Sequence, residues 1–175
     1  FILGFWQTWH MLKDDAHWPR AAAWLQPDAG HPCDFALVGI GANRTSISAT
    51  GANQTPAAIR EALLRYSLQS SAGSLESIRA ADAGDLPDPD ADESATIARV
   101  QELAQRSQLV VSLGGDNSIT YAAALGAFGS NIATAGLITF DAHHDIREGK
   151  SNGSPVRRLI EEAGLAGSRV VQIGI

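Results

Sequence analysis

Short apolar runs alternate with amphipathic segments along most of the chain. The apolar runs are typical of buried strands and cover residues 34–41, 75–81, 109–113, 137–140 and 170–175. Apolar residues recur at helical spacing in residues 55–68, 95–106, 118–128 and 154–163. This βαβα alternation predicts an α/β fold on a mostly parallel sheet, with a solvated connector at residues 83–92.

Local signals refine these helices. Thr55 followed by Pro56 predicts a helix start with Thr55 as N-cap and Pro56 at the first helical position. Further along, a single apolar face is expected on the helix at 95–106, formed by Ile97, Val100, Leu103 and Ala104. Before the first strand, an N-terminal helix is expected to pack against the sheet through His10, His17, Trp18 and Trp24.

Composition and charge exclude several classes of protein. The chain has 175 residues, 45% hydrophobic and 18% charged, which suits one globular domain and neither a disordered nor a fibrous protein. A net charge of -6 and the lack of a basic stripe argue against nucleic-acid binding. Cys33 is the single cysteine, so no intrachain disulfide can form, and a reducing, cytoplasmic compartment is predicted.

The two ends of the chain carry further expectations. Residues 1–12 lack the basic start and cleavage site of a signal peptide, and no apolar run reaches the roughly 20 residues of a membrane span. The chain starts on Phe1 and stops inside the apolar run 169–175. Because a buried strand rarely ends a domain, residues 1–175 are expected to be the N-terminal portion of a single domain.

A cluster of carboxylate and imidazole side chains follows the apolar run that ends at Phe140. There the chain reads Asp141-Ala-His143-His144-Asp145, with two carboxylates and two imidazoles within five residues. Burying carboxylates without a counter-charge is unfavourable, and a divalent cation would neutralise both. If strand geometry continues beyond Phe140, the side chains of Asp141, His143 and Asp145 point to the same side. Oxygen and nitrogen ligands without a thiolate favour Mn, Fe or Zn. The alternative is a surface loop with helix-capping aspartates.

A second cluster follows the apolar run 109–113, at Gly114-Gly115-Asp116-Asn117-Ser118. A glycine turn before a helix could bind a phosphate, because helix N-termini attract anions. The glycines here, however, match neither G-x-G-x-x-G nor G-x-x-x-x-G-K-[ST], the two nucleotide-binding motifs. A tight turn with Ser118 as N-cap explains the glycines equally well. In a parallel sheet, ligands collect beyond the carboxyl ends of strands, so Asp116 and Asn117 are expected to reach the same rim as Asp141.

Together these segments resemble the arginase/agmatinase/formimidoylglutamase family, the ureohydrolases. The resemblance rests on two family motifs in the family's order: G-G-[DG]-H, matched at 114–116 with asparagine in place of histidine at 117, and D-A-H-x-D at 141–145. It extends to a helix start at 55–60 and to residues 151–157, which are similar to a segment of formimidoylglutamases. The resemblance implies a three-layer αβα sandwich, arginase-like, with two Mn²⁺ ions at the carboxyl edge of the sheet.

Roles for the site residues follow from the same resemblance. Asp141 would bridge the two metals, His143 would bind one of them and Asp145 the other, while a metal-bridging hydroxide, not a side chain, would be the nucleophile. Asn117 stands where the family usually has a histidine ligand, which predicts a weakly held metal at that position. Asp116 is predicted to orient Asn117 or a metal-bound water.

Substrate binding is assigned to Arg147, Asn152 and Ser154. Arg147 lies where arginases contact the substrate carboxylate, although it could instead pair with Glu148, and Arg157 is expected on a solvated helix face. The histidine of the arginase H-G-x-P segment is absent, which favours N-formimino-L-glutamate as substrate. The family's last motif, S-x-D-x-D, is also absent, so residues 1–175 alone should not hold a complete binuclear site.

Alternatives remain open at this point. They are an agmatinase or guanidino-acid hydrolase, a non-catalytic homologue, and a nucleotide-binding module built on Gly114-Gly115. Membership of the family would also imply a small-molecule substrate and a homo-oligomer.

Overall fold

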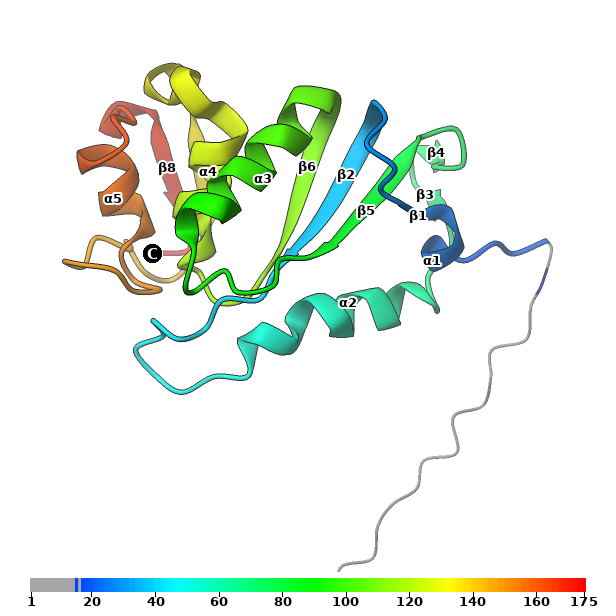
Figure 1. The fold of residues 1–175 in the computed structure, drawn as a ribbon, viewed down its shortest axis with the longest axis horizontal. Coiled ribbons are helices and arrows are strands. Elements are labelled where there is room, and N and C mark those ends of the chain that lie inside the picture. Colours follow the sequence, from blue (N-terminus) through cyan, green and yellow to red (C-terminus); the bar gives the residue numbers. More distant parts are fainter. Residues whose placement is uncertain (1–14, 16) are drawn as a thin grey trace, which may run out of the picture.

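The computed structural model describes Asp15 and residues 17–175 (Figure 1). The absence of a signal peptide at residues 1–12 and the packing role of His10 therefore concern residues outside the described part of the chain.

A four-stranded parallel sheet forms the centre of the molecule, with strand order β1-β5-β2-β6. In chain order its strands are β1 (Gln26–Pro27), β2 (Cys33–Ile40), β5 (Ala80–Asp85) and β6 (Ser107–Gly114). The predicted parallel sheet is confirmed.

Helices cover both faces of β2, because its buried side chains alternate between them. One face packs against Val100 and Leu103 of α3 (Glu93–Arg106) and consists of Ala36, Val38 and Ile40. On the other face lies α2 (Thr55–Leu63), where a Cβ added to Gly39 would stand 3.0 Å from Cβ of Pro56. This arrangement of helix, sheet and helix is the predicted three-layer αβα sandwich.

A separate parallel pair, β7 (Leu137–Phe140) and β8 (Val170–Ile173), follows the main sheet in the chain. It packs on α4 (Ile119–Phe128) and α5 (Pro155–Glu161) through a second apolar cluster that includes Tyr121, Ile132, Leu159 and Leu165. Figure 1 shows α4 and α5 beside β8, at the opposite end of the sheet from β1.

Residues 137–140 form the predicted strand, but the prediction that it is buried is wrong for one of its two faces. Ile138 is 63% exposed and Phe140 81% exposed, while the alternate residues are half-buried. The physical reason is that, among the described residues, helices pack against a single face of the β7–β8 pair.

Several boundaries differ from the sequence prediction. The strand expected at 75–81 begins only at Ala80, because a turn in which Ile78 N–H donates to Leu75 O precedes it. It then continues to Asp85, inside the expected connector. Helix α2 ends at Leu63, and Thr55 is its first residue, with Gln54 at the N-cap position. Thr55 is therefore not the N-cap.

The remaining elements are short. They are α1 (Ala21–Trp24), the hairpin of β3 (Gln69–Ser70) and β4 (Gly73–Ser74), and 3₁₀ turns at Ala52–Gln54, Gly129–Thr134 and Gly167–Arg169. Trp24 packs as expected, stacking on Phe35 at 5.7 Å, whereas Trp18 is exposed. No helix in the described part of the chain is long and apolar enough to cross a membrane.

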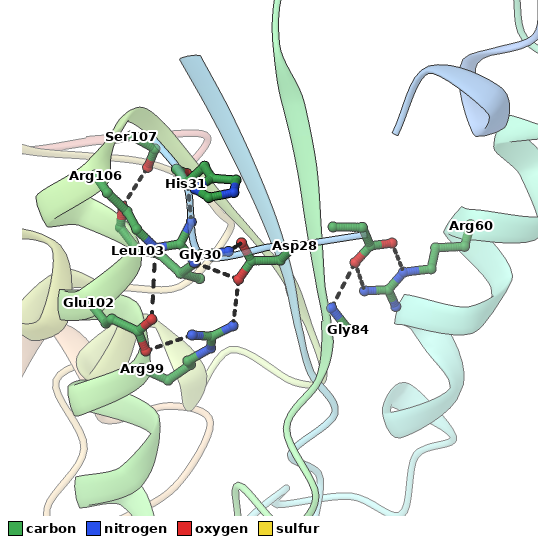
Figure 2. A network of polar contacts seen from close by, with 11 residues as sticks. Asp28, Gly30, His31, Arg60, Gly84, Arg99, Glu102, Leu103, Arg106 and Ser107 are labelled. Atoms are coloured by element: carbon green, nitrogen blue, oxygen red, sulfur yellow. Dashed lines mark hydrogen bonds and ion pairs between the residues drawn. The ribbon is translucent and has the colours of Figure 1, made fainter. Parts of the chain in front are cut away.

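Ion pairs fasten the long helix α3 to the start of the sheet (Figure 2). The carboxylate of Asp28 accepts hydrogen bonds from Arg99 Nη2 at 2.8 Å, from Arg106 Nη2 and from Gly30 N–H at 3.0 Å. Burial by itself would raise the pKa of Asp28, but these donors outweigh it and lower that pKa to about 2. We call Asp28, Arg99 and Arg106 the Asp28 cluster.

A second set of ion pairs joins α2 to β5. The Arg60 guanidinium donates to both carboxylate oxygens of Asp82, at 2.6 and 2.8 Å, and to Asp85. A side chain at Gly39 would collide with the Asp85 carboxylate, so glycine there leaves room for this arrangement.

Candidate metal centre

The loops that follow β2 and β6 leave the sheet side by side. Ile40 and Gly114 are paired in register, and beyond them Asp116 N–H donates to Ala42 O at 2.8 Å. A Cβ on Gly115 would lie 2.1 Å from Ala42 O, so only glycine permits this approach. The glycines therefore form a tight turn that holds Asp116 and Asn117 at the carboxyl edge of the sheet.

Asp116 is buried and joins two loops. Its carboxylate accepts hydrogen bonds from Ser46 Oγ, in the loop after β2, and from Ser118 N–H at 2.9 Å. Ser118 occupies the N-cap position of α4, but its hydroxyl bonds Asp116 and caps no helical N–H. The prediction that Asp116 orients Asn117 finds no contact here, because both carboxylate oxygens are taken by the two serines.

Asn117 connects the β6 edge to the loop after β7. Its Nδ2 donates to Asp145 Oδ2 at 2.6 Å and to Asn152 O at 3.2 Å, while its Oδ1 accepts from Thr120 Oγ1 at 2.7 Å. Asn117 is thus a donor to a predicted metal ligand, and its own role as a ligand stays a prediction.

The Asp141–Asp145 segment is a turn. The strand ends at Phe140, after which Asp141 Oδ1 accepts from the backbone N–H of His143 at 2.8 Å and lies 3.0 Å from His143 Nδ1. Asp145 has φ 54°, a left-handed conformation that aspartate adopts more readily than most residues. The expected strand alternation therefore does not continue through the turn, and side-chain contacts, not pleating, bring Asp141 to His143 and Asp145 to Asn117.

Charge is unbalanced around Asp145. The residue is 7% exposed, and this burial, with the nearby Asp141 carboxylate second, raises the pKa of Asp145. The hydrogen bond from Asn117 and the proximity of His143 lower that pKa only in part. A cation beside these carboxylates would relieve the imbalance.

The donor set fits a divalent transition metal in chemistry but not as a closed site. Carboxylate oxygens from Asp141 and Asp145 and an imidazole nitrogen from His143 are suitable ligands for Mn²⁺ or Zn²⁺. Across Asp15 and residues 17–175, however, no three His, Cys, Asp or Glu side chains surround a common point. The described residues offer part of a metal centre.

A cavity of about 650 Å³ opens over these residues. Its lining includes Asn117, Asp141, His143 and Asp145 together with Ile47, Arg147 and Asn152. The structure therefore brings together all four predicted metal ligands and two of the three predicted substrate-binding residues.

Arg147 lies in this cavity wall as an exposed cation. No ion pair or side-chain hydrogen bond of its guanidinium is found among the described residues. The alternative partner, Glu148, lies 3.6 Å from Arg157 Nη1, and Arg157 also bonds Glu161 at 2.9 Å along α5. Arg157 thus lies on a charged face of α5, with its side chain 33% exposed.

The other two predicted substrate-binding residues have internal partners. Asn152 lines the cavity, but its Oδ1 accepts from Ile47 N–H at 3.2 Å and its carbonyl from Asn117. Ser154 is fully buried, lies 2.7 Å from Ser151 Oγ and does not line the cavity, so its role in substrate binding stays a prediction without a supporting contact.

Sequence reasoning missed the residues that hold these loops together, chiefly Ser46, Ile47 and Thr120. Ser46 and Ile47 lie in the loop after β2, in which the sequence analysis identified no site residue. Thr120 carried a usable signal, since it lies three residues after Asn117 at a helix start, where short polar side chains bond each other.

Comparison with known proteins places this site in a family. A sequence model of the arginase family matches residues 33–175. A curated formimidoylglutamase of Halalkalibacterium halodurans is 35% identical over 174 residues, covering 92% of the chain and 54% of that protein. The chain thus spans about half the length of this relative.

Solved structures agree on the fold. Formimidoylglutamase from Bacillus subtilis superposes with a TM-score of 0.79 at 28% identity, covering 96% of the chain and 56% of that structure. Trypanosoma cruzi formiminoglutamase, crystallised with Mn²⁺, has a TM-score of 0.75 at 24% identity, covering 89% and 57%. At that identity, the second likeness concerns the fold alone.

Proposed function

The chain belongs to the arginase family, and we propose that its protein is a formimidoylglutamase, which hydrolyses N-formimino-L-glutamate to L-glutamate and formamide. The observation that carries this proposal is that groups of opposite charge line one cavity. The carboxylates of Asp141 and Asp145 line it together with the guanidinium of Arg147, which has no ion-pair partner among the described residues.

This distribution of charge suits the proposed substrate. Its formimino group is cationic when protonated and is the group that is cleaved, whereas its glutamate portion carries two carboxylates. A guanidinium binds a carboxylate through two parallel hydrogen bonds. Arg147 would therefore hold the glutamate portion while the formimino carbon lies toward Asp141 and Asp145.

The proposal includes Mn²⁺. Asp141, His143 and Asp145 would hold the metal, with Asn117 beside them, and residues beyond the described ones would complete the site. Bound Mn²⁺ would supply Lewis acidity and lower the pKa of a coordinated water toward neutrality. Asn117 would fix the orientation of Asp145 through its 2.6 Å hydrogen bond. Support for Mn²⁺ comes from the chemistry of these ligands and from membership of the arginase family.

The same charges disfavour agmatine as the substrate. Agmatine carries a distal ammonium, which needs an anionic partner, and the acidic neighbour of Arg147 is Glu148, already paired with Arg157. Arg147 would repel that ammonium. A guanidino acid has a distal carboxylate and remains the closer competitor.

The test is a substrate panel with the full-length protein at saturating Mn²⁺. We expect kcat/KM for N-formimino-L-glutamate to exceed that for agmatine by at least about tenfold, the discrimination of one well-placed charged hydrogen-bond pair, and to exceed that for 4-guanidinobutyrate by less, because that substrate also carries a carboxylate. Arg147→Ala should raise KM for the carboxylate substrates without lowering bound Mn²⁺.

Each other result has a defined meaning. Preference for agmatine would contradict the role of Arg147, and preference for the guanidino acid would retain that role but change the substrate. No hydrolysis of any member at saturating Mn²⁺ would favour a non-catalytic homologue. The cytoplasmic location and the homo-oligomeric state stay predictions.

A further inference from the structure

Gly153 and Arg147 lie side by side at the base of one loop. Arg147 N–H donates to Gly153 O at 2.9 Å, and Gly153 N–H donates to Ser151 Oγ at 3.2 Å. The hydrogen bond between Arg147 and Gly153 therefore closes a loop over residues 148–152. It brings the α-carbon of Gly153 to the side chain of Arg147.

The space over Gly153 is occupied by that side chain. A Cβ on Gly153 would lie 2.9 Å from Arg147 Cδ, 3.4 Å from Arg147 Nε and 3.4 Å from Ile47 Cδ1. Gly153 is not among the glycines with positive φ, so its backbone does not require glycine. The stem of Arg147 lies across the site of the missing side chain, so a methyl group there would displace that stem.

The residues around the α-carbon of Gly153 are held by hydrogen bonds and an ion pair. A methyl group added there would therefore displace the Arg147 side chain and not the loop. Asn152 Oδ1 accepts from Ile47 N–H at 3.2 Å and holds the opposite wall. Lys150 Nζ lies 2.9 Å from Glu93 Oε1 and ties the loop to α3. In contrast, the Arg147 guanidinium has no such partner among the described residues.

We propose that Gly153 is a specificity-determining residue that seats the Arg147 side chain at the cavity wall. This inference rests on the proposed function, in which Arg147 binds a substrate carboxylate. Any side chain at position 153 moves the guanidinium, and the cavity then loses recognition of acidic substrates while retaining its metal edge. Gly153 acts through Arg147 and is a positioning residue.

A double-mutant cycle in the full-length, Mn²⁺-loaded protein tests whether Gly153 positions the Arg147 side chain. The variants are Gly153→Ala, Arg147→Ala and the combination, with Gly167→Ala as control, since a Cβ there would meet only Ile160 Cδ1 at 3.8 Å. We expect Gly153→Ala to raise KM for N-formimino-L-glutamate about tenfold, with little change in kcat or in thermal unfolding. In the Arg147→Ala background the same change should have no further effect.

Two outcomes would overturn the proposal. One is an unchanged KM in Gly153→Ala. The other is an equal rise in KM with and without Arg147, because Gly153 would then act on the loop and not on that side chain.

Failure of the proposed function is recognised separately. If wild type hydrolyses no N-formimino-L-glutamate, calorimetric binding of L-glutamate replaces KM as the measurement. Weaker glutamate binding in Gly153→Ala, again only when Arg147 is present, would support the positioning of Arg147 by Gly153. Absence of glutamate binding by wild type, or equal binding by both proteins, would overturn it.

Discussion

Two buried aspartates of this chain have opposite electrostatic surroundings. Asp28 accepts hydrogen bonds from Arg99 and Arg106, which overcome its burial and lower its pKa to about 2. Asp145 is buried, has another carboxylate nearby and has a neutral amide as its hydrogen-bond donor, so its pKa is raised, first by burial and then by Asp141. Asp28 has its counter-charges within the fold, whereas Asp145 has no ion-pair partner among the described residues.

The difference separates a structural carboxylate from one that we propose to hold a metal. The Asp28 cluster lies between β1 and α3, away from the cavity, and its ion pairs contribute to the stability of the fold (Figure 2). The surroundings of Asp145 are unfavourable for the charged carboxylate and become favourable when a cation binds. Substitutions at the two positions should therefore affect different properties.

The largest effect is expected from Asp145→Asn in the full-length protein. Asparagine tolerates the left-handed φ at this position, so the turn should persist. Activity should fall by more than about 100-fold, since even outer-shell changes at metal sites cost 10- to 100-fold. The metal-free protein should unfold at an unchanged or higher urea concentration, because the unfavourable buried charge is removed. A clear loss of metal-free stability would contradict the comparison.

Asp28→Asn should produce the reverse pattern. It leaves two partly buried guanidinium groups without their shared carboxylate, and we expect the free energy of unfolding to fall by about 2 to 3 kcal/mol. Activity per folded molecule should remain that of wild type. Asp88→Asn is the matched control, since its ion pair with Arg44 is exposed and should be worth less than about 1 kcal/mol. Equal losses in the two variants would show that the Asp28 cluster adds no special stability.

The acid dependence of stability sharpens the comparison. The folded pKa of Asp28, about 2, lies below its usual 3.8, so its stabilising contribution is present above pH 4 and is lost as the pH falls toward 2. We expect a loss of about 1 to 2 kcal/mol after allowing for solvent screening of the ion pairs. Urea unfolding of wild type and Asp28→Asn between pH 2 and 5 measures it, and their free energies should converge at the acid end. Parallel curves would exclude this contribution.

The smallest effect is expected from Asn117→His. Replacing the amide beside Asp145 with imidazole offers a stronger ligand and should tighten Mn²⁺ binding by about tenfold. Calorimetric titration of metal-free protein measures the change. Unchanged Mn²⁺ affinity would place the metal away from position 117.

Much of the fold could be predicted from periodicity. The apolar run at 34–41 and the helical spacing at 95–106 became β2 and α3 within two residues, because both are buried by the partners that their patterns require. The run at 75–81 failed because local turn bonds outcompeted strand pairing until Ala80. Phe140 is exposed because burial depends on a covering layer, which a strand's own sequence does not specify.

The site was predictable in composition but not in its contacts. Strand ends and the D-A-H-x-D spacing identified Asp141, His143 and Asp145, and the cavity brings them together. The hydrogen bonds of Asn117 and the burial of Ser154 depend on how three loops meet, and these positions are distant in sequence. The close approach of Arg147 to Gly153 likewise depends on the path of a neighbouring side chain.

The most direct test of the account is a calorimetric titration of Mn²⁺ into the metal-free full-length protein and its Asp145→Asn variant. We predict saturable binding of two ions per chain in wild type, hydrolysis of N-formimino-L-glutamate that rises in step with occupancy, and loss of both in the variant at undiminished stability. Wild-type protein that binds no Mn²⁺, or that is fully active without it, would contradict the assignment of this carboxylate edge as a metal centre.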